Sequence, residues 1–156
     1  MRLVLALLLL TGAIAAGDDT KDKAIKEERA KLVGTWKVDA VEVNGQKIPA
    51  EAIKDFEFIF TADSLTRKKD GKAESGSGYK LDPSKSPKWI DMTGTTDGKE
   101  QSIPAVYKLD GDTLTMCFRH DYKKNGKPGE VQKRPEKLDG GEGTQQVLMT
   151  LKRQKP

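Results

Sequence analysis

Apolar and polar residues alternate along most of the chain after residue 33, which is typical of strands that bury one face. The clearest case is Phe56–Phe60, where every second residue is phenylalanine. The same period returns with Leu114, Met116 and Phe118. A change of phase inside Gly34–Val43 predicts a bulge, or burial on both sides. The pattern predicts about eight short strands, at 34–43, 56–60, 64–69, 72–77 with 79–81, 89–93, 105–109, 113–119 and 147–153.

Short turn signals join these strands into consecutive hairpins. Asn44-Gly45 and Asp70-Gly71 are typical of two-residue hairpin turns. Pro49–Lys54 is expected to form one helical turn between two strands. We therefore expect an all-β fold, an antiparallel up-and-down β-barrel of about eight strands with a short N-terminal helix. Such a barrel has room inside for side chains or for one small ligand.

The first sixteen residues break this pattern, because 13 of them are apolar and six are leucine. Arg2 precedes the apolar run, and Ala13-Ile14-Ala15 has the small-x-small spacing that a signal peptidase recognises. We predict that residues 1–16 are a cleaved signal peptide and that the protein is exported, to the periplasm or the outside. The alternative is a membrane anchor, for which a run of about 14 residues is short.

Residues 17–33 form a separate, strongly charged segment, which is expected to be a helical or partly ordered lead-in to a single domain over 34–156. Its Lys and Glu residues are expected to face solvent, and its apolar residues form a thin stripe. The stripe consists of Ala24, Ile25, Ala30, Leu32 and Val33.

Composition changes once the first sixteen residues are set aside. Of the 55 apolar residues, 42 remain in 140 positions, and Leu, Ile, Val and Phe make up 25 of these. That low content would indicate disorder only together with a high net charge. The whole chain has a net charge of +4, and removing residues 1–16, which include Arg2, lowers it to +3. We therefore expect one small domain with a thin core, which excludes a two-domain enzyme and a membrane-spanning bundle.

Several short motifs occur in a characteristic order along the domain. They are Gly34-Thr35-Trp36, Val43-Asn44-Gly45, Tyr79–Pro83, Pro87–Asp91, Tyr107–Leu114, Cys117-Phe118, Arg134-Pro135 and Leu151–Arg153. In these motifs and their order the chain resembles a family of small exported lipocalin-like domains of unknown function, abundant in planctomycete-type bacteria. The resemblance implies a barrel and brings no activity with it. Trp89 and Leu138 depart from the pattern, which would have a variable residue at the first position and an aromatic one at the second.

One structural contact is expected from two lines of reasoning. The resemblance implies that Trp36 packs under an arginine from the last strand and closes one end of the barrel. Strand phase independently puts Arg153 on the apolar face of 147–153, where an unpaired charge is costly. We expect Arg153 to cover Trp36 and to stabilise the fold.

Candidate catalytic and metal-binding groups have simpler interpretations. Asp110 and Asp112 flank a glycine, where aspartate favours a turn. His120 is the only histidine, and a lone histidine does not build a typical zinc site. Cys117 is the only cysteine and lies in an apolar stretch, where it is expected to be a buried small hydrophobe. We expect no enzyme activity, no metal and no cofactor.

Asp91 leaves two orientations open, because it alternates with Ile90 and Met92 inside an apolar strand. If Asp91 faces inward, it needs a donor such as Arg119 or Tyr107 and becomes a recognition group in the cavity. The outward orientation is favoured.

The remaining basic feature is the 123–137 loop, which is expected to be solvated and to make at most weak contact with an anionic envelope surface. We expect no nucleic-acid binding, and we expect the protein to be a monomer. The function that we expect is non-catalytic binding of a small, partly apolar ligand in the barrel, lined by Phe58, Tyr107, Met116 and Phe118. The alternative is a cell-envelope interaction or scaffold module whose barrel is filled and holds no ligand.

Overall fold

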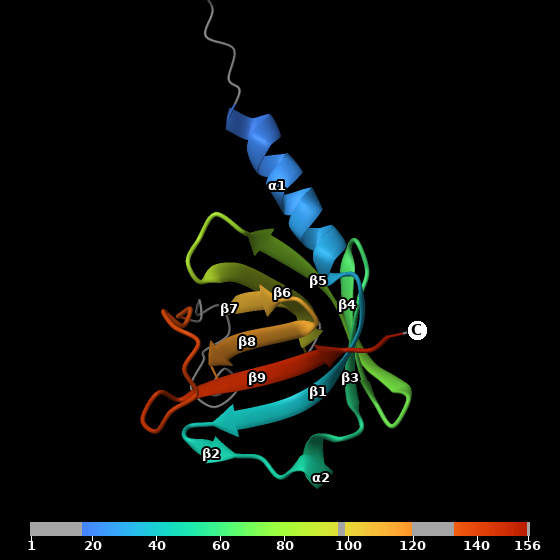
Figure 1. Cartoon of the computed structure of the whole chain (residues 1–156), viewed down its shortest axis with the longest axis vertical. Helices are drawn as coiled ribbons and strands as arrows, with labels where there is room; N and C mark the ends of the chain where they lie inside the picture. The colour runs from blue at the N-terminus through green and yellow to red at the C-terminus, as the bar shows by residue number, and fades with distance from the viewer. Residues whose placement is uncertain (1–16, 97–98, 120–132, 156) are drawn as a thin grey trace, which may run out of the picture.

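The computed structural model describes residues 17–96, 99–119 and 133–155, which contain two helices and nine strands (Figure 1). Neither described helix is long and apolar enough to cross a membrane. The predicted signal peptide and His120 lie outside the described residues. The elements are α1 (Gly17–Leu32), β1 (Gly34–Val43), β2 (Gln46–Lys47), α2 (Ala50–Ile53), β3 (Phe56–Phe60), β4 (Ser64–Lys69), β5 (Lys72–Asp82), β6 (Lys88–Thr96), β7 (Lys99–Asp110), β8 (Thr113–Arg119) and β9 (Gln146–Arg153).

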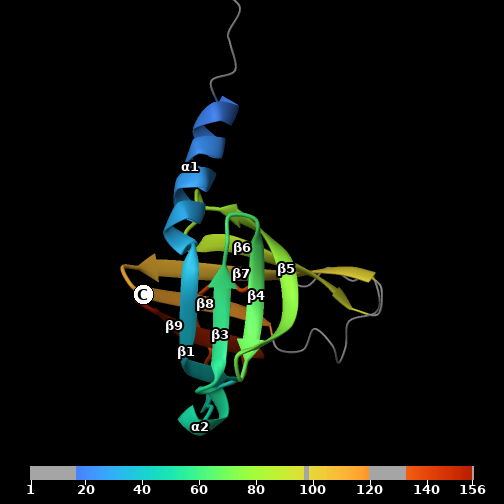
Figure 2. The same ribbon diagram turned by 90° about the vertical axis from the view of Figure 1, so that its right-hand side faces the viewer.

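Eight of the strands close into an antiparallel up-and-down barrel, so the predicted fold class is confirmed. From β3 to β9 each strand pairs with the next, and β1 pairs with both β3 and β9. The short β2 adds a hairpin to β1. The two helices lie at opposite ends of the barrel in both views (Figures 1 and 2).

The turns take the conformations that their residues favour. Asn44 and Gly45 have φ angles of 49° and 83°, and Asp70 and Gly71 have 50° and 72°. Two successive positive φ angles give a turn whose twist matches a hairpin, and Asn-Gly and Asp-Gly tolerate them best. The phase change in β1 is a bulge, because the register with β9 shifts between Val38 and Ala40.

The strands are tilted relative to the barrel axis, so a row of residues that pair from strand to strand runs from one end of the barrel to the other. One row of inward-facing residues shows this. It begins at Lys88, beside α1, and passes through Tyr107, Met116 and Met149 to Val41. Position along such a row determines how deeply an inward-facing side chain is buried.

Residues 133–145 pack over the outer wall of β6 to β9, and we call them the strap. Gly45 donates its backbone N–H to the Gly140 carbonyl, and the thiol of Cys117 donates to the Asp139 carbonyl at 3.4 Å. Gly140 is buried, and a Cβ there would lie 2.7 Å from that of Leu148. Residues 133–137 were expected to belong to a solvated loop, but they are part of a strap that packs on the outer wall, where Cys117 is buried.

Candidate functional site

The barrel interior divides into two halves, which we call the sealed half and the open half. Residues that pair across neighbouring strands share a face, so pairing identifies the inward-facing side chains. In the sealed half, next to α1, most of them are at most 9% exposed, and Lys88 and Leu109 at its edge are more exposed. The buried set consists of Trp36, Phe60, Leu65, Tyr79, Leu81, Ile90, Met92, Ala105, Tyr107, Leu114, Met116 and Leu151. In the open half Val147 is 7% exposed, but the other apolar side chains that pack on this core are only partly buried: Val41, Phe56, Phe58, Ile103, Phe118 and Met149.

The last two turns of α1 close the sealed half. Leu32 is completely buried and accepts a 2.8 Å hydrogen bond from the indole nitrogen of Trp36. Ile25, Glu28 and Arg29 complete a face with the i, i+3, i+4, i+7 spacing of a docked helix. Of the predicted stripe, Ile25 and Leu32 lie on this face, whereas Ala24, Ala30 and Val33 are exposed. Glu28 takes a buried position instead.

Glu28 is the centre of a buried polar cluster that sequence reasoning missed. Its residue is only 3% exposed, and its carboxylate accepts hydrogen bonds from Lys88 at 2.5 Å and from the Tyr107 hydroxyl at 3.2 Å. Lys31 lies 3.5 Å away on the rim. A buried carboxylate is tolerated because it is paired and hydrogen-bonded. The only sequence signal was the helical spacing of Glu28 with Ile25 and Leu32.

The pKa values of Glu28 and Tyr107 are shifted in this cluster. Burial is the largest influence on Glu28 and raises its pKa, but Lys88, Tyr107 and Lys31 together outweigh it, so the pKa lies below its ordinary value. Burial and the neighbouring Glu28 carboxylate raise the pKa of Tyr107 well above its ordinary value. The cluster is therefore a lysine–carboxylate pair with a neutral phenol donor at neutral pH.

Arg153 and Arg29 hold the rest of the sealed end. The Arg153 guanidinium lies 4.1 Å above the centre of the Trp36 ring and donates to the carbonyls of Val33 (2.8 Å) and Lys31 (2.5 Å). The Arg29 guanidinium lies 4.5 Å from the Tyr79 ring centre and donates to the Tyr79 carbonyl. These contacts tie β9, β1, β5 and α1 into one lid.

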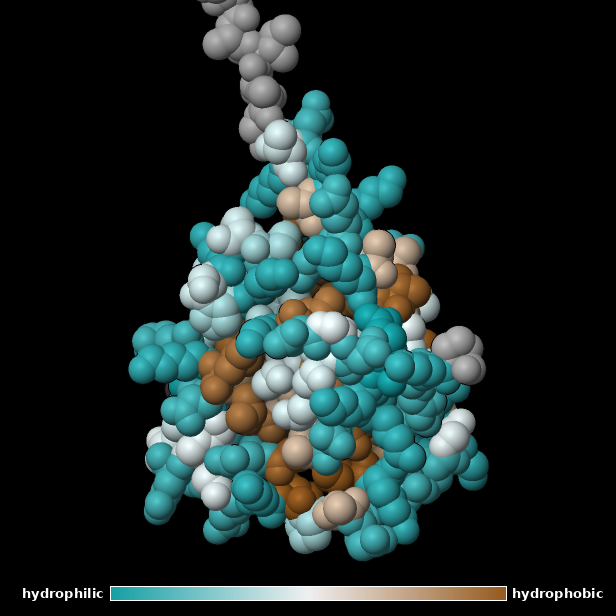
Figure 3. All heavy atoms as spheres, in the orientation of Figure 1, coloured by the Kyte–Doolittle hydropathy of each residue, from teal (hydrophilic) through white to brown (hydrophobic). Residues whose placement is uncertain are grey.

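The open half has apolar walls and a basic edge. Phe58 pairs with Arg67 across β3 and β4, and Lys69 lies 5.2 Å from the centre of the Phe56 ring. Arg67 is also 3.0 Å from Glu74. Figure 3 shows apolar atoms gathered around a hollow between β2 and α2.

The four predicted ligand-lining residues all face inward, but they are divided between the two halves. Phe58 and Phe118 belong to the open half and are partly buried. Tyr107 and Met116 are each 1% exposed and belong to the sealed half, where the Tyr107 hydroxyl is bonded to Glu28. Alternation along each strand identified all four as inward-facing but did not give their height in the barrel.

Asp91 faces outward and is held by the strap. Arg134 donates to its carboxylate at 2.5 Å and to the Ala105 carbonyl at 2.6 Å, and its guanidinium lies 4.5 Å from the Trp89 ring centre. Arg134 thus leaves the solvated basic loop in which it was expected and becomes a clamp. The clamp covers the outer wall, where Cys117 is completely buried and burial raises the pKa of its thiol. Lys123, Lys124 and Lys127 of that loop lie outside the described residues.

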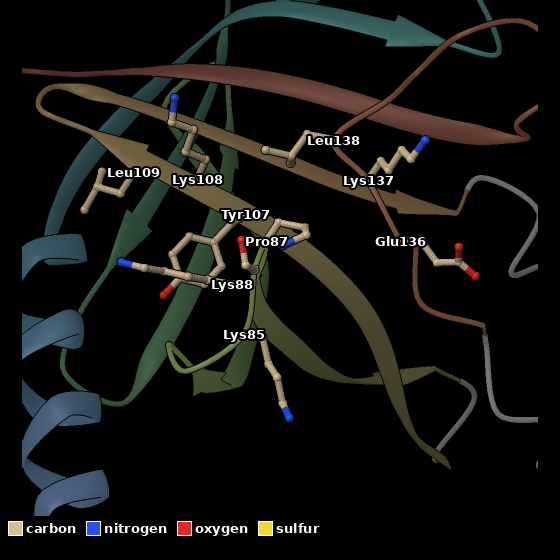
Figure 4. Close-up of a pocket in the computed structure, with 10 residues that line it drawn as sticks. Lys85, Pro87, Lys88, Tyr107, Lys108, Leu109, Glu136, Lys137 and Leu138 are labelled. Carbon is tan, nitrogen blue, oxygen red and sulfur yellow. The ribbon is translucent and has the colours of Figure 1, made fainter.

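A second concave feature lies at the edge of the barrel, between the 85–88 segment, β7 and the strap. This groove has a volume of about 470 Å³. Figure 4 shows Lys85, Lys108 and Lys137 on three sides of it, with Pro87 and Tyr107 between them. Its other lining side chains include Leu109, Leu138, Lys88 and Glu136.

Neither concave feature carries a metal-binding constellation. Within residues 17–96, 99–119 and 133–155, no group of three or more His, Cys, Asp or Glu side chains is placed to hold a metal ion. No protein-family model, curated protein or solved structure matches the chain. Any functional assignment therefore rests on the geometry of the barrel and its outer wall.

Proposed function

We propose that the protein binds a small, partly apolar ligand in the open half of the barrel, without catalysis. One observation carries this proposal: inward-facing apolar side chains in that half, including Phe58, Phe118 and Met149, are only partly buried. Side chains that point into a barrel are normally covered by one another. Here they contact the solvent that enters from the open end.

The energetics favour an apolar occupant. Each Å² of apolar surface removed from water contributes roughly 25 cal/mol, so a ligand that covers these side chains gains affinity without rearranging the barrel. The sealed half beneath is rigidly closed, which supplies a preformed floor. Preformed, mostly apolar sites with a few polar groups are typical of small-molecule binding.

The edge of the open half favours a ligand with a polar or anionic end. Arg67 and Lys69 lie directly across from Phe58 and Phe56 on the same face of the sheet. A ligand whose apolar part contacts the phenylalanines would have its polar end near these two cations. This arrangement supports a ligand that is partly, not wholly, apolar.

The absence of catalysis is part of the proposal. Glu28, Lys88 and Tyr107 are the one buried ionisable cluster among the described residues that resembles acid–base machinery. Its three members are bonded to one another, and its buried carboxylate lies beneath the lid rather than in the open half. We interpret the cluster as structural.

The cellular setting and the family are proposals on sequence grounds. The run of 13 apolar residues in the first sixteen supports export to the periplasm or the outside. The ordered motifs, from Gly34-Thr35-Trp36 to Leu151–Arg153, support membership of a lipocalin-like family. Monomeric behaviour is also proposed.

A second candidate function is an interaction or scaffold module at the cell envelope. The observation that favours it is α1, whose residues 19–24 are all exposed and extend beyond the barrel (Figure 1). A helix that is polar all round is typical of a spacer between bodies. In this version the barrel serves only as a stable end piece and its open half holds no ligand.

Native mass spectrometry of the protein purified from its own source separates the two candidates. A retained small molecule, lost on denaturation, supports ligand binding. Phe118→Ala is expected to reduce retention, whereas Val33→Ala, which shortens an exposed apolar side chain outside the barrel, is the matched control. A wild-type protein that carries no adduct and does not bind an apolar fluorescent probe would contradict the ligand-binding proposal.

A further inference from the structure

The groove at the edge of the barrel is chemically different from the barrel interior. Its rim carries Lys85, Lys108 and Lys137, and its floor is apolar, with Pro87 and Leu138, while Leu109 lines the end beyond Lys108 (Figure 4). Across the whole chain, 28 basic residues are nearly balanced by 24 acidic ones, but four lysines and one glutamate line the groove. The imbalance is therefore local.

The lysines of the rim are weakly committed to other partners. Lys108 lies 3.7 Å from Asp110, in a pair whose side chains are 66% and 78% exposed. Such exposed pairs contribute little and exchange readily. Lys85 lies 4.9 Å from the Trp89 ring centre, and flexible lysine stems allow its ammonium to turn over the groove. Only Lys88 is firmly held, by the buried Glu28.

The apolar floor and the cationic rim together select a ligand class. We propose that this groove binds a compact organic anion, with a short or flat apolar body and a carboxylate or phosphate group. The body covers Pro87 and Leu138, and the charged group is placed among Lys85, Lys108 and Lys137. A volume of about 470 Å³ lies within the range of small-molecule sites. The groove shares no lining residue with the open half, so it is a second site.

Electrostatic complementarity sets the behaviour of this site. Rim charges act mainly by attracting the anion, and salt screens them over about 8–10 Å. Binding therefore weakens as ionic strength rises. A neutral molecule of the same shape gains the apolar contact but not the attraction.

The experiment is an NMR titration of the ¹⁵N-labelled protein with three probes of one shape, 2-naphthoate, 2-naphthyl phosphate and the neutral 2-naphthol. Both anions are expected to shift the backbone amides of Lys85, Leu109 and Leu138, and the tighter anion identifies the preferred head group. The double variant Lys108→Gln/Lys137→Gln is expected to weaken anion binding about fivefold. The control Lys23→Gln/Lys47→Gln removes two exposed lysines elsewhere and leaves the affinity unchanged.

Three results would overturn the proposal. The first is equal affinity for 2-naphthol and the two anions. The second is unchanged affinity in the groove double variant. The third is a set of shifts confined to the open half, around Phe58 and Phe118, which would overturn the groove while supporting the barrel site. Conversely, groove shifts that persist in Phe118→Ala establish the groove independently of the barrel.

Discussion

The two halves of the barrel interior are built from the same strands and the same alternation, yet their inward-facing side chains are buried to different degrees. On β3, Phe60 is 1% exposed in the sealed half, whereas Phe58, two residues earlier on the same face, is only partly buried. The difference comes from α1, which covers one end with Leu32, Glu28 and Arg29. The alternation along the strands determines which side chains face the barrel interior. A helix outside the barrel determines which part of that interior is accessible to solvent.

The largest expected effect compares two phenylalanines of one strand. Phe60→Ala removes a fully buried ring and is expected to lower the free energy of unfolding by about 3–5 kcal/mol. Phe58→Ala is expected to cost roughly half as much, because water already reaches that ring. Chemical denaturation of both variants measures the difference. Equal losses would mean that the open half is as tightly packed as the sealed half.

The next effect tests the buried carboxylate. Glu28→Gln keeps the shape but removes the charge that Lys88 and Tyr107 bind, and it is expected to cost about 2 kcal/mol at pH 7. Because the folded pKa of Glu28 is lowered from 4.5, its contribution is complete above that pH and is lost as the pH falls through the folded pKa. Wild type and variant should therefore converge in acid.

Unfolding curves between pH 7 and pH 3 measure this convergence. The exposed neighbour in Glu27→Gln is the matched control, and its stability should follow that of wild type throughout. A constant gap between Glu28→Gln and wild type across the pH range would show that the loss is steric rather than ionic.

A smaller loss is expected when the lid loses its arginine. Arg153→Ala removes the guanidinium over Trp36 and its hydrogen bonds to Val33 and Lys31, which together contribute about 1–2 kcal/mol. The melting temperature should fall, while Lys152→Ala, next to it on the exposed face, should have a smaller effect. An unchanged melting temperature in Arg153→Ala would remove Arg153 from the lid.

The smallest effect concerns the outer wall behind Phe118. Arg134→Ala releases the strap from Asp91 and from the Ala105 carbonyl, and is expected to cost about 1 kcal/mol of local stability. That cost makes opening about fivefold more frequent, so Cys117 should react about fivefold faster with a thiol reagent. Lys133→Ala is the control. Equal labelling rates would show that another contact holds the strap.

The features that the sequence predicted are those set by near neighbours. Asn44-Gly45 and Asp70-Gly71 specified their turns, and alternation in β3 and β8 specified which side chains face inward. The bulge in β1 was visible as a phase change. These features follow from local backbone and pleat geometry, which a single sequence contains.

The missed features depend on contacts between distant segments. Glu28 and Tyr107 are 79 residues apart, and Arg134 and Asp91 are 43 apart. No period along the chain reports which lysine or arginine will reach a given carboxylate. Tyr107 and Met116 were grouped with Phe58 and Phe118 because alternation gives a side chain's face but not its height in a tilted barrel.

The pairing of β1 with β9 has a consequence for how the chain folds. β1 contributes to the barrel from residue 34, yet its partner on one side, β9, is synthesised more than a hundred residues later. Until then both β1 and β8 present unpaired edges, which are templates for association with other chains. Pairing over such a sequence separation also makes closure slow. Residues 146–153 therefore determine when the protein stops being prone to aggregation, and a chain lacking them would retain two open edges.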